Sequence, residues 1–356
     1  MHAGFHKTGT TSFQEFCRRN REALRSGGLH YARFDFQRVL DRPNHSYVFR
    51  SAYHAAVDGD NTLRASLVRE LQRQLDVCDR LLVSGEVICV LREPARMLLL
   101  QDLRALADEI RFILLVRHPK SYFQGALQEH LKTWGNAFGL PEDRLATVID
   151  HEWGSLYTKR LALFREHLAE DELIVRRYED AVRAPNGVIG YLVEDCLGLH
   201  LPTALYASSL RINAALAHET VLLNGALKSL RDEANGATID RLVGKINGAP
   251  GNGCRQAFAA ALAHRLPPIA TELSWLKANF GIEYDLDEVA FDQLDETRLW
   301  SREYVDALLA FARKKLARDD QRLLCSALDF IAANRPADAR QSGVLTAASQ
   351  ELRRGS

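Results

Sequence analysis

The residues that decide the fold are Gly4–Ser12, which read Gly-Phe-His-Lys-Thr-Gly-Thr-Thr-Ser. The segment Met1–Phe5 is typical of the end of a strand, and it is short for a first strand, which leaves open whether the natural chain begins further upstream. Apolar residues at helical spacing follow the loop, namely Phe13, Phe16, Cys17 and Leu24. A glycine-rich loop between a strand and a helix directs amide N–H groups at one point and favours an anion there. The sequence therefore predicts an anion-binding loop.

The loop differs from the one used by nucleoside triphosphatases. Aligned on Gly4 and Gly9 it has the form G-x-x-x-x-G-T-T, with Thr10 where a lysine is usual, and the lysine lies upstream at Lys7. No strand ends in the apolar-then-Asp pattern that holds magnesium in such enzymes. Hydrolysis of ATP or GTP is disfavoured, and we expect no metal site.

Strand-like and helix-like segments alternate downstream of the loop. Apolar runs of strand length occupy residues 80–85, 111–116 and 173–178, and helical patterns occupy residues 61–79, 92–109, 121–134 and 144–168. Such alternation predicts an α/β fold in which a parallel sheet lies between two layers of helices. Beyond Pro185 only helical patterns occur. We expect a nucleotide-binding α/β core over residues 1–200, a mainly helical region over 201–340 that completes a donor and acceptor cleft, and a loose tail over 341–356.

The loop resembles that of sulfotransferases that use 3′-phosphoadenosine 5′-phosphosulfate (PAPS), where the usual form is K-[ST]-G-T-[TS]. A second resemblance lies at residues 113–121, an apolar strand ending in Arg117 and followed by His118-Pro119. The family's serine eight residues after the arginine is replaced by Gly125, so the 3′-phosphate would rely on Arg117, on backbone amides, or on Ser121 or Gln124. The resemblance implies donor contacts from His6, Lys7, Thr8, Gly9, Thr10, Thr11, Ser12, Arg117, Ser121 and Gly125.

Two weaker resemblances follow. The triplet Tyr178-Glu179-Asp180 matches one that follows a core strand in many sulfotransferases, where the tyrosine lies near the adenine. The stretch that contains Arg211, with Glu219 and Asn224 after it, is similar to an R-x-N…E…N stretch of bacterial members. The resemblance implies that Tyr178 contacts the adenine and that Arg211 helps to close over the donor.

Sulfuryl transfer needs a base for the acceptor's proton and positive charge on the leaving phosphate. Lys7 and the loop amides would supply the charge. Two residues are candidates for the base. His45 lies in the polar turn formed by residues 41–46, and the ordinary pKa of an imidazole suits a base at neutral pH. Glu86 follows Ser84-Gly85 at the carboxyl end of a strand, where α/β sheets place their ligands. We favour His45 narrowly and leave both open.

The composition bounds the remaining possibilities. The 356 residues carry 46 Lys and Arg against 46 Asp and Glu, so net charge does not indicate a nucleic-acid partner. The six cysteines form no C-x-x-C pair, and no apolar run is long enough for a membrane helix, so we expect a cytoplasmic enzyme. The expected function is transfer of the sulfuryl group of PAPS to a carbohydrate, a lipid-linked sugar or a small molecule. The alternatives are a P-loop-type kinase and an inactive PAPS-binding protein.

Overall fold

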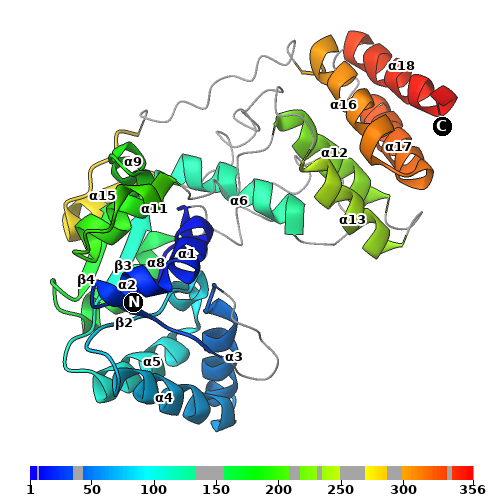
Figure 1. Cartoon of the computed structure of the whole chain (residues 1–356). Coiled ribbons are helices and arrows are strands. Elements are labelled where there is room, and N and C mark those ends of the chain that lie inside the picture. Colours follow the sequence, from blue (N-terminus) through cyan, green and yellow to red (C-terminus); the bar gives the residue numbers. More distant parts are fainter. Residues whose placement is uncertain are drawn as a thin grey trace. The chain divides into compact units, whose positions relative to one another are not determined.

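The chain forms two compact units. The computed structural model describes residues 1–5, 8–34, 43–133, 156–207, 217–230, 235–248, 269–286, 299–334 and 339–355. The first unit comprises Met1–Pro119, Gly154–Asn213 and Ala270–Leu286, and the second comprises Lys120–Trp153, Ala214–Ile269 and Asp287–Ser356 (Figure 1). The division therefore differs from the single boundary expected near residue 200, because the chain leaves the first unit at Pro119 and returns to it twice.

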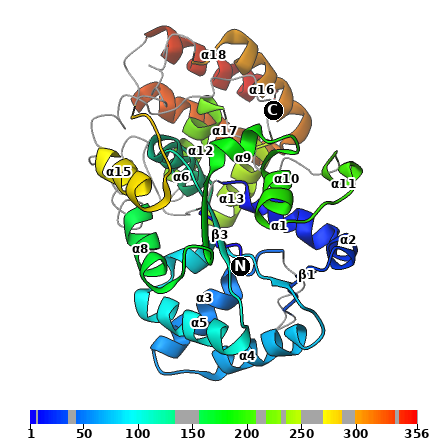
Figure 2. The same cartoon turned by 90° about the vertical axis from the view of Figure 1, so that its left-hand side faces the viewer.

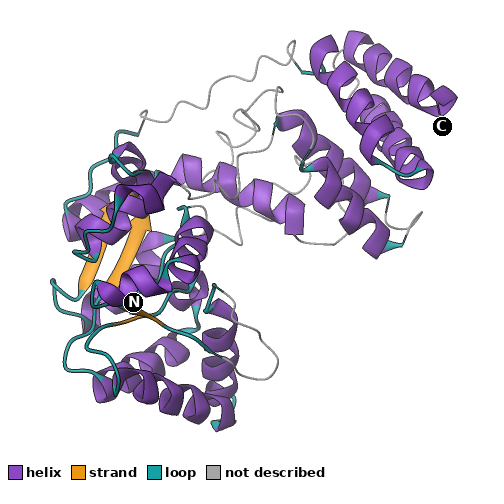
Figure 3. Ribbon diagram, viewed as in Figure 1, coloured by secondary structure: helices purple, strands orange, loops and turns teal. Residues whose placement is uncertain are grey.

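Short parallel strands lie at the centre of the first unit. Strand β1 (His30–Tyr31) pairs with β2 (Leu81–Leu82), and β3 (Phe112–Val116) pairs with β4 (Leu173–Arg177). The β3–β4 pair stands out in the ribbon of Figure 3. His2 forms parallel bridges to both Ser84 and Ile113, so the start of the chain runs between the two pairs. The α/β class and the parallel direction agree with the prediction. The structure has two-stranded sheets joined through His2, and not the continuous three-layer sheet that was expected.

Helices and loops begin close to both ends of each short strand. The helical elements of the first unit are α1 (Thr10–Arg19), α2 (Arg21–Ser26), α3 (Ser46–Val57), α4 (Thr62–Leu75), the 3₁₀ helix η1 (Glu86–Val90), α5 (Glu93–Leu106), α8 (Tyr157–His167), α9 (Tyr178–Arg183), α10 (Gly187–Gly190), the π-helix η2 (Tyr191–Cys196), α11 (Thr203–Ala207) and α15 (Ile269–Phe280), of which Ile269 itself belongs to the second unit. Helix α3 was not expected from the sequence, which was interpreted as a polar turn up to Ser46.

Helices cover both faces of β3. Its five residues are all buried, and alternate side chains point to opposite faces. Ile113 and Leu115 pack in one apolar cluster with Phe13 of α1 and Leu192 of η2. On the other face, the ring of Phe112 lies 4.9 Å from that of Phe164 in α8. Figure 2 shows α1 and α10 on one side of β3 and α8 on the other. Burial on both faces explains why this strand reads as a continuous apolar run.

The described part of the second unit is helical, in agreement with the expected character of the C-terminal region. Its helices are α6 (Pro119–Thr133, whose first residue belongs to the first unit), α12 (His218–Ser229), α13 (Gly236–Ile246), α16 (Arg302–Lys315), α17 (Arg318–Asn334) and α18 (Ala339–Gly355). Leu222, Ile239, Leu308 and Leu328 belong to one buried cluster. The buried carboxylate of Asp320 is held by Lys245 at 2.6 Å and by Arg241 at 3.2 Å.

The expectation of a loose tail over residues 341–356 is wrong. Residues 339–355 form α18, and Leu345, Ala348 and Leu352 are buried against the other helices of the unit. The Ser349 hydroxyl donates to the carbonyl of Cys325 in α17. The small polar residues that suggested a tail lie among apolar residues at helical spacing, and that spacing buries one face of the helix.

The described helices include none that is both long enough and apolar enough to cross a membrane.

Candidate functional site

Two glycines fix the shape of the loop at the start of the chain. A Cβ atom on Gly4 would lie 2.7 Å from Cγ2 of Thr10 and 2.8 Å from Nε2 of His2, which is closer than van der Waals contact allows. Gly9 has φ +76, and its Cβ would lie 3.0 Å from Cγ1 of Val188. Glycine adopts backbone of this left-handed kind without the steric cost that a Cβ atom adds. Both glycines of the G-x-x-x-x-G spacing are therefore required by the fold.

The loop leads directly into the N-terminus of α1. Gly9 is the N-cap residue, and it has no side chain with which to cap the first amides of the helix. The first turn contains no acidic residue, so the partial positive charge of the helix end is not offset within that turn. The Thr8 hydroxyl is buried and donates to the carbonyl of Phe5 at 2.6 Å, which stabilises the turn. An anion is the partner that this geometry favours. His6 and Lys7 lie outside the described residues.

Gly9→Ala is expected to destabilise the protein by about 1–2 kcal/mol, because alanine pays for the left-handed conformation. The new methyl group would also press on Val188. Thermal unfolding of Gly9→Ala beside Gly28→Ala would check this, since Gly28 has φ +80 and no atom within 4 Å of its Cβ position. A larger loss for Gly9→Ala than for Gly28→Ala is expected. Equal losses would mean that the contact with Val188 costs nothing.

Glu86 is tied to the loop. It is the first residue of η1, directly beyond the Ser84 bridge to His2, and is partly buried. The hydroxyl of Thr10, the first residue of α1, donates to Oε1 of Glu86. The next residue, Val87, donates its N–H to the Ser46 hydroxyl at 3.2 Å. The carboxylate thus lies beside the N-terminus of α1, oriented by a hydrogen bond.

His45 is placed differently from the expectation of an accessible loop residue. It is 3% exposed and packs between the rings of Tyr31 and Phe34. The centroid of each of these rings lies 5.0 Å from the centroid of the His45 ring. Its backbone N–H donates to the carbonyl of Ser84 at 2.9 Å, and the Ser84 N–H donates to Nδ1 of His45 at 3.1 Å. An amide can only donate, so Nδ1 carries no proton and the neutral ring carries its hydrogen on Nε2. Nδ1 accepts a hydrogen bond and Nε2 carries the hydrogen, so neither nitrogen of such a ring is placed to accept a further proton.

His2 continues this buried network. Its Nδ1 lies 2.7 Å from the hydroxyl of Ser84, and its ring meets that of Phe13 edge to face at 4.8 Å. Burial lowers the pKa of His2 to about 3, so the ring is neutral at physiological pH. Its Nε2 would lie 2.8 Å from a Cβ on Gly4. The buried His2 ring therefore packs against the start of the loop, at Gly4.

Arg117 and Tyr178 are brought together at the carboxyl ends of β3 and β4. The register pairs Val116 with Arg177, so the two residues that follow are neighbours. The Arg117 guanidinium lies over the ring of Tyr178, 5.2 Å from its centroid. The hydroxyl of Tyr157, at the start of α8, donates to the Arg117 carbonyl and accepts from the Arg117 N–H. Tyr157 was not singled out from the sequence.

The other expected donor contacts belong to the second unit or fall outside the described residues. Ser121 and Gly125 are partly buried residues of α6, which belongs to the second unit from Lys120 onward. Glu219 and Asn224 are buried in α12, also in the second unit, where the Asn224 side chain donates to Asn247 at 2.8 Å. Arg211 lies outside the described residues.

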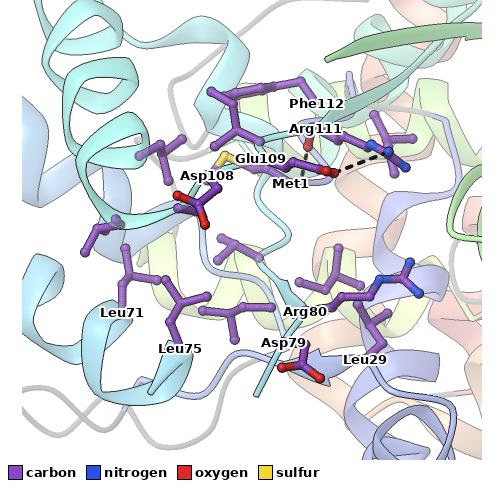
Figure 4. Close-up of a pocket in the computed structure, with 18 of the residues that line it drawn as sticks. Met1, Leu29, Leu71, Leu75, Asp79, Arg80, Asp108, Glu109, Arg111 and Phe112 are labelled. Atoms are coloured by element: carbon purple, nitrogen blue, oxygen red, sulfur yellow. Dashed lines mark hydrogen bonds and ion pairs between the residues drawn. The ribbon is translucent and has the colours of Figure 1, made fainter. Parts of the chain in front are cut away.

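A cavity of about 740 Å³ lies at the opposite end of the strands. It is lined by Met1, by residues at the start of β2 and β3, and by Leu71 and Leu75 of α4 (Figure 4). The Met1 amino group donates to the carbonyl of Arg111 there. Ligands of parallel α/β sheets bind at the carboxyl ends of the strands, so the loop, Glu86 and Arg117 form the candidate site and this cavity does not.

The described residues contain no group of three or more histidine, cysteine, aspartate or glutamate side chains placed to hold an ion.

Comparisons with protein-family models, with curated proteins and with solved structures find no match to this chain.

Proposed function

We propose that the protein is a PAPS-dependent sulfotransferase. The supporting observation is that the two features expected to bind anions, the loop and Arg117, follow neighbouring parallel strands. The glycine-shaped loop follows the bridge at His2, and Arg117 follows β3, whose residue Ile113 pairs with His2. Neighbouring strands lie about 5 Å apart, so the two features share one edge of the sheet. A nucleotide with a phosphate at each of two positions suits such an arrangement.

The proposal assigns residues to each part of the PAPS molecule. The α1 amides and Lys7 bind the 5′-phosphosulfate, Arg117 binds the 3′-phosphate, and Tyr178 contacts the adenine. Ser121, Gly125 and Arg211 are the further donor contacts that the family resemblance implies. The proposal includes the full fold of that family, in which the two strand pairs act as one sheet between layers of helices, and a location in the cytoplasm. The acceptor is a hydroxyl or amine of a carbohydrate, a lipid-linked sugar or a small molecule.

The reaction is an in-line displacement at sulfur. The acceptor oxygen or nitrogen bonds to sulfur while the bond from sulfur to the 5′-phosphate oxygen breaks, and 3′,5′-ADP leaves with the bonding electrons. Glu86 takes the acceptor's proton, because the Thr10 hydroxyl orients its carboxylate beside the loop. The cationic loop offsets the charge that develops on the leaving phosphate.

One observation favours a second candidate, a P-loop-type kinase. The Glu86 carboxylate beside the start of α1 is a group of the kind that holds magnesium in nucleoside triphosphatases. That reading requires ATP with magnesium as the preferred ligand. The inactive PAPS-binding protein is the third candidate, and it rests on Gly125 in place of serine.

Titration calorimetry with 3′,5′-ADP and with ATP plus magnesium, together with a transfer assay that uses labelled PAPS and a panel of acceptors, separates the three. We expect 3′,5′-ADP to bind at least tenfold more tightly than ATP, since only the former offers a 3′-phosphate to Arg117. We also expect binding and transfer to persist in EDTA. Loss of activity in EDTA that magnesium restores would favour the kinase. Tight 3′,5′-ADP binding without transfer to any acceptor would favour the inactive protein.

A further inference from the structure

The segment Gly281–Leu286, which follows α15, reaches the carboxyl ends of β3 and β4. The hydroxyl of its Tyr284 lies 2.8 Å from the carbonyl oxygen of Val116 and 2.9 Å from Oε2 of Glu179. Burial and the neighbouring Glu179 carboxylate raise the pKa of Tyr284, so the phenol keeps its proton and can donate. The segment is more than a hundred residues downstream of both strands, and all of these residues belong to the first unit.

Glu179 connects this tyrosine to the residue after Arg117. Its second oxygen, Oε1, accepts the backbone N–H of His118 at 3.2 Å. The His118 ring in turn meets Tyr284 edge to face at 5.4 Å, and its Nε2 donates to the carbonyl of Asp285 at 3.1 Å. One carboxylate therefore links the strand end at β3 to the segment that carries Tyr284.

Side chains from other elements hydrogen-bond the backbone on both sides of Arg117 in the sequence as well as that of Arg117 itself. Tyr157 of α8 engages both the N–H and the carbonyl of Arg117. Tyr284 engages the carbonyl of Val116, and Glu179 engages the N–H of His118. Three consecutive residues thus have backbone groups bound to side chains that their own strand does not supply. The Arg117 side chain extends from this hydrogen-bonded backbone, and its guanidinium lies over the ring of Tyr178, the residue before Glu179.

We propose that Glu179 and Tyr284 are positioning residues that fix the Arg117 backbone so that its guanidinium meets the 3′-phosphate of the donor. The inference rests on the proposed function, and it adds the Gly281–Leu286 segment to the donor site. An arginine whose backbone is already ordered binds phosphate without a further loss of conformational entropy. If its backbone is mobile before binding, that entropy is lost on binding and the affinity falls. The effect should therefore appear only with ligands that carry a 3′-phosphate.

The test compares calorimetric affinities for 3′,5′-ADP and for 5′-AMP, which differ only in the 3′-phosphate. In Tyr284→Phe and in Glu179→Ala we expect affinity for 3′,5′-ADP to fall about tenfold, while affinity for 5′-AMP changes by less than about twofold. Glu179→Gln should keep the wild-type ratio of affinities. Its amide oxygen can accept the His118 N–H, and its amide nitrogen can donate to Tyr284, which then donates to Val116.

Tyr53→Phe is the matched control. Tyr53 is a buried tyrosine of the same unit whose hydroxyl donates to a carboxylate, that of Asp102, at 2.9 Å. Its loss should leave the ratio unchanged, even if it lowers the melting temperature as much as Tyr284→Phe does. The pair Glu179→Ala and Glu179→Gln gives the same comparison should Tyr284→Phe not fold.

The outcomes separate the inference from the function on which it rests. An unchanged ratio in Tyr284→Phe and Glu179→Ala, with a wild-type protein that prefers 3′,5′-ADP, would overturn the positioning role and leave the sulfotransferase proposal standing. An equal loss of affinity for both nucleotides would also overturn it, since a merely structural effect gives that result. A wild-type protein with no preference for the 3′-phosphate would overturn both.

Discussion

Glu86→Gln is expected to lower the rate of sulfuryl transfer by a factor on the order of 100 to 10,000, the usual contribution of a general base. Glutamine is nearly the same shape and can still accept the Thr10 hydroxyl, so the loop should keep its structure. It cannot take a proton from the acceptor. Affinity for 3′,5′-ADP should change little, and this places the loss in the chemical step. The measurement is turnover with labelled PAPS and an acceptor found by screening.

His45→Asn is the comparison that decides between the two candidate bases. The asparagine side-chain oxygen can replace Nδ1 as the acceptor of the Ser84 N–H. We expect turnover within about fivefold of wild type, together with a lower melting temperature because ring contacts with Tyr31 and Phe34 are lost. A severe loss of turnover in His45→Asn with a mild one in Glu86→Gln would return the role of base to His45.

Lys7→Ala is expected to lower transfer by a factor on the order of 1,000, because the leaving phosphate loses the cation that the proposed mechanism assigns to it. Lys7 lies outside the described residues, so the expectation rests on its place in the sequence between Gly4 and Gly9 and on the family resemblance. The fold should be unaffected, which circular dichroism and the melting temperature would check.

Lys159→Ala is the matched control for that loss. Lys159 is an exposed residue of α8 in the same unit, and its replacement removes the same charge. It should leave transfer unchanged. Turnover near the wild-type level in Lys7→Ala would remove the lysine from the mechanism.

The sequence was most informative where a segment's own residues decide its structure. The apolar run at 111–116 gave β3 because all five residues of the strand are buried. The glycine spacing of the loop was interpretable for a similar reason, since the clash at Gly4 and the left-handed turn at Gly9 exclude most other residues. Helix α3 was missed although Val48, Phe49, Ala52, Tyr53 and Ala56 are buried at helical spacing. The polar residues before it suggested a turn over residues 41–46, whereas the helix begins at Ser46.

Roles that depend on distant partners could not be predicted. The burial of His45 follows from its paired hydrogen bonds with Ser84, 39 residues away, and nothing near His45 indicates them. Tyr284 meets Val116 across 168 residues, in a stretch assigned from the sequence to the helical region. The order of elements was thus readable from local pattern, whereas the side chains that support the site come from contacts that only the folded chain makes.

A crystal structure of the protein with 3′,5′-ADP tests the central claim most directly. The account predicts that the 5′-phosphate lies on the amides at the start of α1, at Thr10–Ser12, and that the 3′-phosphate lies against the Arg117 guanidinium at the end of β3. It also predicts that Tyr284 and Glu179 keep their contacts with the backbone beside Arg117. A nucleotide bound in the cavity at the amino ends of β2 and β3, or one whose 3′-phosphate makes no contact with Arg117, would contradict it.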